Sequence, residues 1–377
     1  MMNKILRYLN LGAIVGPLPV TLVNGTIADA NDVMSDLQWI ANQVNANASA
    51  GAGTIARNIL YNGSMQLAQR IGTGTVTVTG TKAYGLDRWQ VASGAAGSAS
   101  ASRVATVALH QFNYAHRMQR TAGNTATTLI QVAQSLESYD SIQMQGQTVT
   151  LSFYARAGAN YSANLNALVA TVYTGTGSDE NVLTGYTGSA ASVTQTFNIT
   201  NSWARYTVTG AIPATATEVG LVFAMTPTGT AGASDSFDIT GTQLEISPSA
   251  SSFDFRPFQE MVARCQRYYQ KSFILDFAPV FNTASNSSPF YFPAVAAGTK
   301  NFRQAFTLQT PMRSTALGVI YDPFASDNQV YDQTQAAPCA GCSIYANANT
   351  ASLIGKYPVS ALAADELCAN WSIDGEL

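Results

Sequence analysis

The amino-acid sequence predicts a mainly all-β protein, and three observations support this fold class. Charged residues make up only 11% of the 377 residues, whereas about 25% is usual for a soluble domain. Thr, Ser, Gly and Asn are abundant instead, as expected for strands whose hydroxyl-bearing faces meet water. From Arg57 to about Phe255, apolar and polar residues alternate in short runs that end at Gly, Asn or Ser. Runs of this kind predict antiparallel strands.

The composition also narrows the function classes. A net charge of −3 provides no basic footprint for nucleic acid. Two histidines are too few for a His-rich metal site. We find no nucleophile–base set, close carboxylate pair, phosphate-binding loop or metal-ligand spacing. We therefore expect a protein that is not an enzyme and that uses no cofactor and no metal.

Residues 1–56 predict a small separate segment. Lys4 and Arg7 precede an apolar stretch that imitates a secretion signal, but Gly12, Gly16 and two prolines interrupt it. The stretch is also too short and broken for a transmembrane helix, so we expect no membrane insertion. Secretion through this segment is the alternative.

A short helix is predicted within this segment. Apolar side chains recur there in steps of three and four residues, the spacing of a coiled-coil seam, at Ala30, Val33, Leu37, Ile40 and Val44. So short a seam is not stable alone. It fits either an amphipathic helix on a globular core or a parallel bundle that joins identical chains into a homotrimer. The stretch Asn45–Thr54 then predicts a flexible linker.

Residues 57–257 predict a β-sandwich. In Thr148–Ala155, Val149, Leu151 and Phe153 share one face, while hydroxyl-bearing residues occupy the other. Glu218–Met225 alternates in the same way. Many such strands without intervening helices predict two antiparallel sheets of the jelly-roll type.

A dense basic and aromatic segment, Asp254–Phe273, follows the predicted sandwich. A proline suited to a first helical turn is followed by apolar residues at helical spacing. This pattern predicts a short linking helix that leads into a C-terminal β domain, the two together covering residues 258–377. The residues expected to form the domain junction are Arg256, Pro257, Cys265, Arg267, Tyr268 and Tyr269. The arginines would donate to carbonyls or carboxylates across it.

The four cysteines are too few and too uneven for a disulfide scaffold. Cys265 is expected to be a buried hydrophobe. Cys339 and Cys342 have CxxC spacing, but Pro338 and Gly341 predict a surface turn, where both thiols would be reactive. A zinc site would need Cys265 and Cys368 to converge on that turn. Pairing and metal binding are both left open.

Two tryptophans of the predicted sandwich, Trp89 and Trp203, are candidate glycan contacts, because sugars stack on aromatic faces. Each lies in a strand-like run, so a core position is the competing interpretation. Asp87 and Arg88, which precede Trp89, are expected to pair with each other.

Several distinctive stretches occur in a fixed order along the chain. The predicted sandwich contains NILYNGSMQLAQR (Asn58–Arg70), YGLDRWQV (Tyr84–Val91) and ITGTQLEI (Ile239–Ile246). After it come FDFRPFQEMVARCQRYYQKS and the ending CANWSIDGEL. Together these stretches resemble bacteriophage tail fibre proteins that carry a carbohydrate-binding-module-like jelly-roll domain. In that ending, Ile373 and Gly375 depart from the W-x-A-D-A-E-L of the family.

The resemblance implies a structural component of a phage tail, assembled in the host cytoplasm and located in the virion. Its N-terminus would attach to other virion tail proteins, and its outer domains would recognise a host-surface polysaccharide. Two alternatives stay open: an adaptor or head-decoration fibre that binds no receptor, and a polysaccharide depolymerase.

Overall fold

The computed structural model describes residues 36–38, 40, 57–285 and 287–377. The chain divides into two units, residues 1–56 and 57–377, which we describe separately. In the first unit the described residues are helical, and Leu37 and Ile40 are 54% and 40% exposed. Ala30, Val33 and Val44 lie outside the described residues, so the seam and the homotrimer stay predictions.

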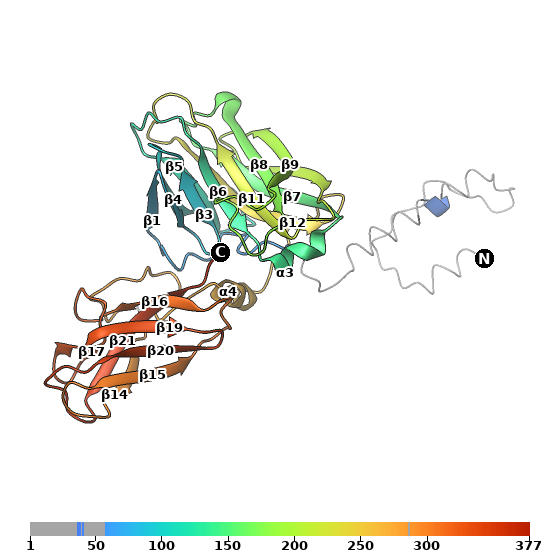
Figure 1. Ribbon diagram of the computed structural model, residues 1–377. Coiled ribbons are helices and arrows are strands. Elements are labelled where there is room, and N and C mark those ends of the chain that lie inside the picture. The colour runs from blue at the N-terminus through green and yellow to red at the C-terminus, as the bar shows by residue number, and fades with distance from the viewer. Residues whose placement is uncertain (1–35, 39, 41–56, 286) are drawn as a thin grey trace, which may run out of the picture. The chain divides into compact units, whose positions relative to one another are not determined.

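The second unit begins with a sandwich of two antiparallel six-stranded sheets (Figure 1). The first sheet has the order β1 (Thr75–Thr79), β4 (Ser98–Ala105), β5 (Tyr114–Arg120), β12 (Ser236–Ile246), β7 (Thr148–Ala157) and β10 (Ala204–Ala211). The second has the order β2 (Lys82–Tyr84), β3 (Gln90–Ser93), β6 (Ile130–Ser135), β11 (Glu218–Met225), β8 (Ala167–Gly175) and β9 (Ala190–Asn198). Short helical turns connect some strands: α3 (Ser138–Ser141), η1 (Ile142–Met144) and η2 (Asn164–Asn166).

The sandwich core forms where the inner faces of the two sheets meet. Val149, Leu151 and Phe153 of β7 are fully buried there, as their alternation predicts. The opposite face of β7 differs from the prediction, because Thr150 and Ser152 are buried as well. The chain that follows β12 covers them: the Thr150 hydroxyl donates to the carbonyl of Ser247 at 2.8 Å.

A single helix, α4 (Phe258–Gln266), connects the sandwich to the C-terminal sheet. Pro257 occupies its N-cap position, where a missing N–H costs nothing. The C-terminal antiparallel sheet has the order β15 (Asn301–Thr307), β20 (Thr350–Lys356), β19 (Ala340–Ala346), β16 (Ala316–Tyr321), β21 (Glu366–Asp374), β17 (Tyr331–Asp332) and β18 (Ala337–Pro338). Two further strands, β13 (Tyr269–Lys271) and β14 (Phe290–Pro293), also pair with β21.

The predicted fold class is therefore confirmed: the protein is mainly β, with antiparallel sheets and few short helices. The sandwich and the C-terminal sheet each have their own hydrophobic core. Among the described residues, no helix is both long and apolar enough to cross a membrane.

Candidate functional site

The stretch Phe253–Lys271, which we call the junction segment, contributes to a buried polar network and to an open groove. In the network, Arg267 donates from Nε and from a terminal amino group to the two carboxylate oxygens of Glu137, both at 2.7 Å. The hydroxyl of Tyr268 donates to the same carboxylate. Burial raises the pKa of Glu137, but the hydrogen bonds from Arg267 and Tyr268 outweigh it, so the net pKa is lowered.

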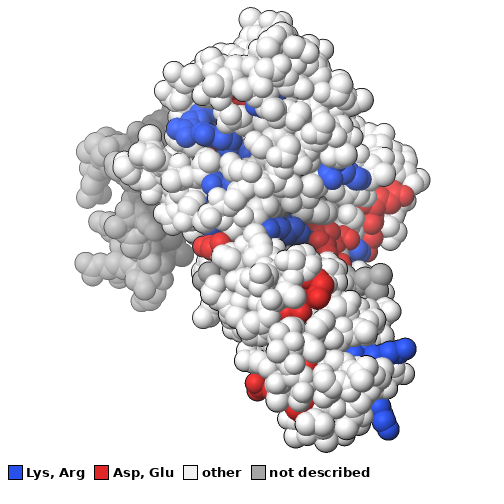
Figure 2. All heavy atoms as spheres, turned by 90° about the vertical axis from the view of Figure 1, so that its left-hand side faces the viewer, with Lys and Arg blue, Asp and Glu red and all other residues white. Residues whose placement is uncertain are grey.

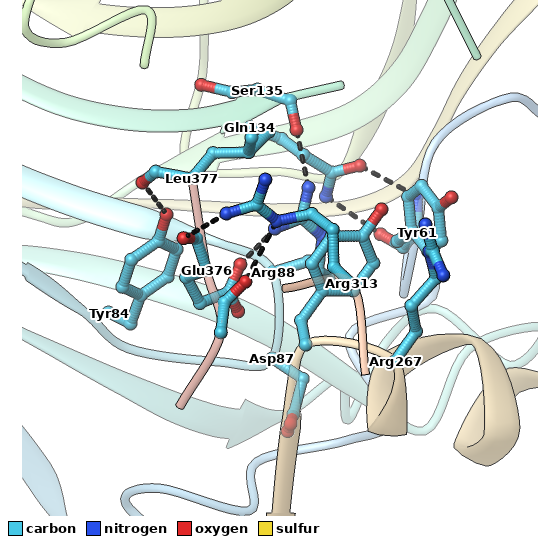
Figure 3. A network of polar contacts seen from close by, with 12 residues as sticks. Tyr61, Tyr84, Asp87, Arg88, Gln134, Ser135, Arg267, Arg313, Glu376 and Leu377 are labelled. Atoms are coloured by element: carbon cyan, nitrogen blue, oxygen red, sulfur yellow. Dashed lines mark hydrogen bonds and ion pairs between the residues drawn. The ribbon is translucent and has the colours of Figure 1, made fainter. Parts of the chain in front are cut away.

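Arg88 lies at the centre of this network (Figure 3). Its guanidinium pairs with Glu376, donates to the carbonyl of Ser135 at 2.6 Å, and lies 3.5 Å from the ring centre of Tyr268. The predicted pairing of Asp87 with Arg88 is wrong, because Asp87 accepts two 2.7 Å hydrogen bonds from Gln69 instead. Arg88 also has a φ of 69°, a backbone conformation that costs free energy outside glycine. The ion pair and the ring contact stabilise it.

The last residues of the chain belong to the same network. The carbonyl of Leu377 accepts hydrogen bonds from Tyr84 at 3.1 Å and from Asn181 at 2.9 Å. Arg313 donates to the carbonyls of Gly375 and Glu376 at 2.9 and 2.8 Å. The sequence ending Asp-Gly-Glu-Leu therefore returns to the sandwich. Its place among the family landmarks was the one sequence signal for this role.

The structure places the predicted junction residues in two groups. Cys265, Tyr268 and Tyr269 are buried, and burial raises the pKa of the Cys265 thiol. Tyr269 also lies under the Arg70 guanidinium at 4.1 Å. Arg256 and Pro257 lie at the other end of the segment and remain partly or fully exposed. That these residues lock the sandwich to the C-terminal sheet stays a prediction.

The surface turn predicted for the CxxC pair is wrong. Cys339 is 3% exposed and packs in the C-terminal core, because β19 begins beside it with a bulge at Gly341, whose φ is 59°. Cys342 is partly exposed. All four cysteines are free, and no group of three or more His, Cys, Asp or Glu side chains suited to a metal occurs among the described residues.

The two tryptophans occupy different environments. Trp89 is fully buried and donates its indole N–H to the carbonyl of Asn62 at 3.2 Å, so it offers no surface to a sugar. Its candidacy as a glycan contact is therefore wrong. Trp203 is half-buried, and the guanidinium of Arg156 lies 4.8 Å from its ring centre.

An open groove lies where the start of the sandwich chain meets the junction segment. It encloses about 190 Å³, and aromatic rings form much of its wall. Phe112 stacks on Phe255 with ring centres 5.4 Å apart, and Phe253 meets both rings edge-on. Phe255 and Phe258 are 57% and 52% exposed. These exposed rings are the strongest recognition feature that sequence reasoning missed.

A bulge in β12 makes the groove possible. The register between β12 and β7 shifts between Thr240 and Gln243, and Gly241 takes a φ of 56° there. A Cβ atom on Gly241 would lie 2.5 Å from the ring of Phe112. Glycine therefore allows the Phe112 ring to pack against the sheet and support Phe255.

Polar groups line the edges of the groove. Arg256 donates to the carbonyl of Asn58 at 2.7 Å, and Arg264 lies 4.2 Å from the ring centre of Tyr61. Gln111 and Asn113 add exposed amide groups. Among the described residues, Gln66 Oε1 is a buried acceptor without a hydrogen-bond partner at this groove. Exposed rings edged by amide and guanidinium groups are typical of sites for polar ligands with apolar faces.

Sequence reasoning also missed a pair of neighbouring carboxylates. Glu218 is fully buried and accepts a hydrogen bond from the backbone N–H of Glu180 at 2.5 Å. Burial raises the pKa of Glu218 to about 7. Because Glu218 has no exposed surface, this pair is not placed to act on a polysaccharide.

The surface has few charged residues. Figure 2 shows one face on which uncharged residues predominate and basic residues do not form a continuous band. This view agrees with the low charged fraction of the sequence, 11%.

Comparisons with known proteins give partial structural similarities. No protein-family model matches the chain, and no curated protein matches it significantly. A solved CBM4 carbohydrate-binding module is 17% identical, with a TM-score of 0.30, and the match covers 49% of this chain and 98% of that chain. The CBM61 module solved with β-1,4-galactotriose is 13% identical, with a TM-score of 0.29, covering 51% and 99%. The enzymatically active domain of tailspike protein 4 from bacteriophage CBA120 is 12% identical, with a TM-score of 0.30, covering 50% and 21%. At these scores the similarities do not assign a ligand or an activity to this chain.

Proposed function

We propose that this protein is a bacteriophage tail fibre component that binds a glycan on the host surface through the groove of its sandwich domain. The observation that carries the proposal is the pair of exposed rings, Phe255 and Phe258, beside amide and guanidinium groups. A pyranose ring presents apolar C–H faces and equatorial hydroxyls, so it matches stacking surfaces edged by hydrogen-bond donors and acceptors. The sequence landmarks shared with phage tail fibres support the virion role.

Binding of the purified protein to a panel of bacterial O-antigens and capsular polysaccharides tests the proposal. Phe255→Ala and Phe258→Ala should each weaken binding at least about tenfold, the size expected from losing one stacking contact. Tyr139→Ala is the matched control, because Tyr139 is 85% exposed but lies on α3, outside the groove. Equal binding by all three variants, or no binding to any glycan, would contradict groove-mediated recognition.

The same incubation separates recognition from depolymerisation. We expect no increase in reducing ends when the protein is mixed with a polysaccharide that it binds. Steady release of oligosaccharide would favour the depolymerase alternative instead.

The proposal includes a homotrimer held together partly by the N-terminal helix. Leu37 and Ile40 are exposed in the single chain, as a seam that awaits partner chains requires. Light scattering should give three times the chain mass of 39.8 kDa. Leu37→Asp should weaken virion docking while the outer domains stay folded. A monomer at micromolar concentration would contradict the trimer.

A further inference from the structure

A second hollow lies on the sandwich, on the outer face of the sheet formed by β5, β12 and β7. It encloses about 270 Å³ and is lined by Arg117, Arg156, Asp238 and several small polar residues. Asp238 is paired in register with Arg117 on one side and with Arg156 on the other. Three charged side chains from three adjacent strands therefore meet at one point.

The two arginines share one carboxylate. Arg117 donates to Asp238 from Nε at 2.7 Å and from a terminal amino group at 2.9 Å. Arg156 donates to Asp238 through Nε alone, at 2.8 Å. Among the described residues, neither terminal amino group of Arg156 has a protein partner, although its side chain is only 24% exposed. Two cations against one anion leave a net positive charge at the hollow.

The neighbouring histidine does not change this balance. His116 is fully buried beneath the sheet, and burial lowers its pKa to about 3, although the charge of Asp238 opposes the shift. It is therefore neutral near pH 7, and the charge of the hollow comes from Arg117, Arg156 and Asp238.

The geometry also fixes the free guanidinium. Asp238 is 2% exposed, and its carboxylate accepts the hydrogen bond from Nε of Arg156. The guanidinium of Arg156 also lies 4.8 Å from the ring centre of Trp203. Asn201, Ser234 and Ser236 contribute amide and hydroxyl groups to the walls. At Gly158, a Cβ atom would lie 2.2 Å from the carbonyl of Ser234, so the backbone segments approach closely at this end.

We infer that this hollow binds the carboxylate of an acidic sugar, a hexuronate residue, through the free edge of Arg156. A guanidinium edge and a carboxylate form two parallel charge-assisted hydrogen bonds, which a neutral sugar cannot accept equally well. The surrounding hydroxyl and amide groups would accept hydrogen bonds from the sugar hydroxyls and donate hydrogen bonds to them. This site deepens the proposed glycan recognition but uses different residues from the groove.

Calorimetric titration of the full chain with galacturonate and glucuronate tetrasaccharides, and with their methyl esters, tests the inference. We expect at least one acid to bind and its ester to bind at least about tenfold more weakly, since esterification removes the charge-assisted pair. Equal binding of acid and ester, or no binding of either acid, would overturn the inference. Competition with inorganic phosphate tests whether the hollow is selective for the uronate. If phosphate displaces the bound uronate at the same concentration as free uronate does, the inference is also overturned, because the hollow would then hold any anion.

Variants locate the site. Arg156→Gln should weaken uronate binding roughly ten- to one-hundredfold. The affinity of Arg156→Lys for uronate should lie between those of the unchanged protein and Arg156→Gln, because lysine keeps the charge but not the planar edge. Arg205→Gln is the matched control: it removes an arginine from β10 that donates to Ser152 and does not line the hollow. Melting curves identify any variant that fails to fold. If Arg156→Gln does not fold, Ser234→Trp serves instead: its side chain at the exposed rim should block the hollow and weaken uronate binding without removing charge.

The groove variant Phe255→Ala separates this inference from the proposed function. Loss of neutral-glycan binding without loss of uronate binding would show two independent sites. If uronate binding fails while neutral-glycan binding through the groove persists, only the present inference falls.

Discussion

The two ends of the junction segment are built from similar residues but have different environments. Its first part, Phe253–Arg264, leaves phenylalanine rings in water and arginines along an open groove. Its second part, Cys265–Tyr269, buries its rings and thiol, and Arg267 forms a two-point ion pair. Composition alone therefore does not separate a recognition surface from a structural contact. What separates them is whether each ring is covered and each polar group already has a partner.

The largest expected effect comes from the buried ion pair. Glu376→Ala leaves the Arg88 guanidinium, 1% exposed, without its carboxylate, and should lower the free energy of unfolding by roughly 3–5 kcal/mol. Urea unfolding measures this loss, and limited proteolysis should then cut near Arg256 and release two folded parts. Glu366→Ala is the control, because Glu366 starts β21, the strand that precedes the chain end, and its exposed side chain has no hydrogen-bond or ion-pair partner among the described residues.

An unchanged unfolding midpoint for Glu376→Ala, together with unchanged protease resistance, would show that the chain end does not hold the junction. A loss equal to that of Glu366→Ala would lead to the same conclusion.

The fold was predictable because its signals are local. Alternation at Glu218–Met225 coincides with β11, and Pro257 followed by helical spacing gave α4. The main contacts of the junction were not predictable, since Arg88 and Glu376 lie 288 positions apart and no local period encodes their meeting. The CxxC prediction failed for a related reason: Pro338 and Gly341 do favour a bend, but core packing turns it into a strand bulge with Cys339 inside.

The groove escaped prediction because its rings come from two loops. Phe112 precedes β5, whereas Phe253 and Phe255 follow β12, so no single run of residues shows the cluster. A bulge at Gly241 brings them together, and a single glycine in a strand-like run is a weak signal.

The second prediction concerns Arg267, whose side chain is more exposed than that of Arg88. Arg267→Ala should cost about 1–3 kcal/mol, because Glu137 loses two charged hydrogen bonds. The loss should depend on pH. The folded-state pKa of Glu137 lies below its ordinary value of 4.5, so its contribution is present above pH 4.5 and is lost as pH falls through the folded pKa.

On acidification, the free energy of unfolding of Arg267→Ala should therefore fall less steeply than that of the unchanged protein. Arg303→Ala is the matched control, since Arg303 is exposed on β15 and has no partner among the described residues. If the two variants show the same pH slope, the Glu137 contact does not stabilise the junction.

The third prediction concerns the thiols and alters reactivity rather than stability. Cys342 is partly exposed, and its hydrogen bond with Cys339 lowers its pKa, so it should react first with iodoacetamide. Cys265, Cys339 and Cys368 are buried and should react only on unfolding. Mass spectrometry should find one fast site per chain, absent in Cys342→Ser. Fast labelling of Cys339 would contradict its burial and support the surface turn predicted from the sequence.

The smallest effect on stability should come from the groove. Phe258 is 52% exposed at the start of α4, so Phe258→Ser removes little buried apolar surface and should change the free energy of unfolding by no more than about 0.5 kcal/mol. Tyr268→Ala, ten positions further along the same segment, removes a fully buried ring and should cost roughly 3–5 kcal/mol. Urea unfolding of the two variants side by side measures the difference. Because the Phe258 ring contributes so little to stability, we expect it to serve ligand binding. Phe258→Ser should therefore keep the melting temperature of the unchanged protein but lose glycan binding. Comparable destabilisation by both substitutions would mean that the groove is part of the structural contact, and the division of the junction segment would be wrong.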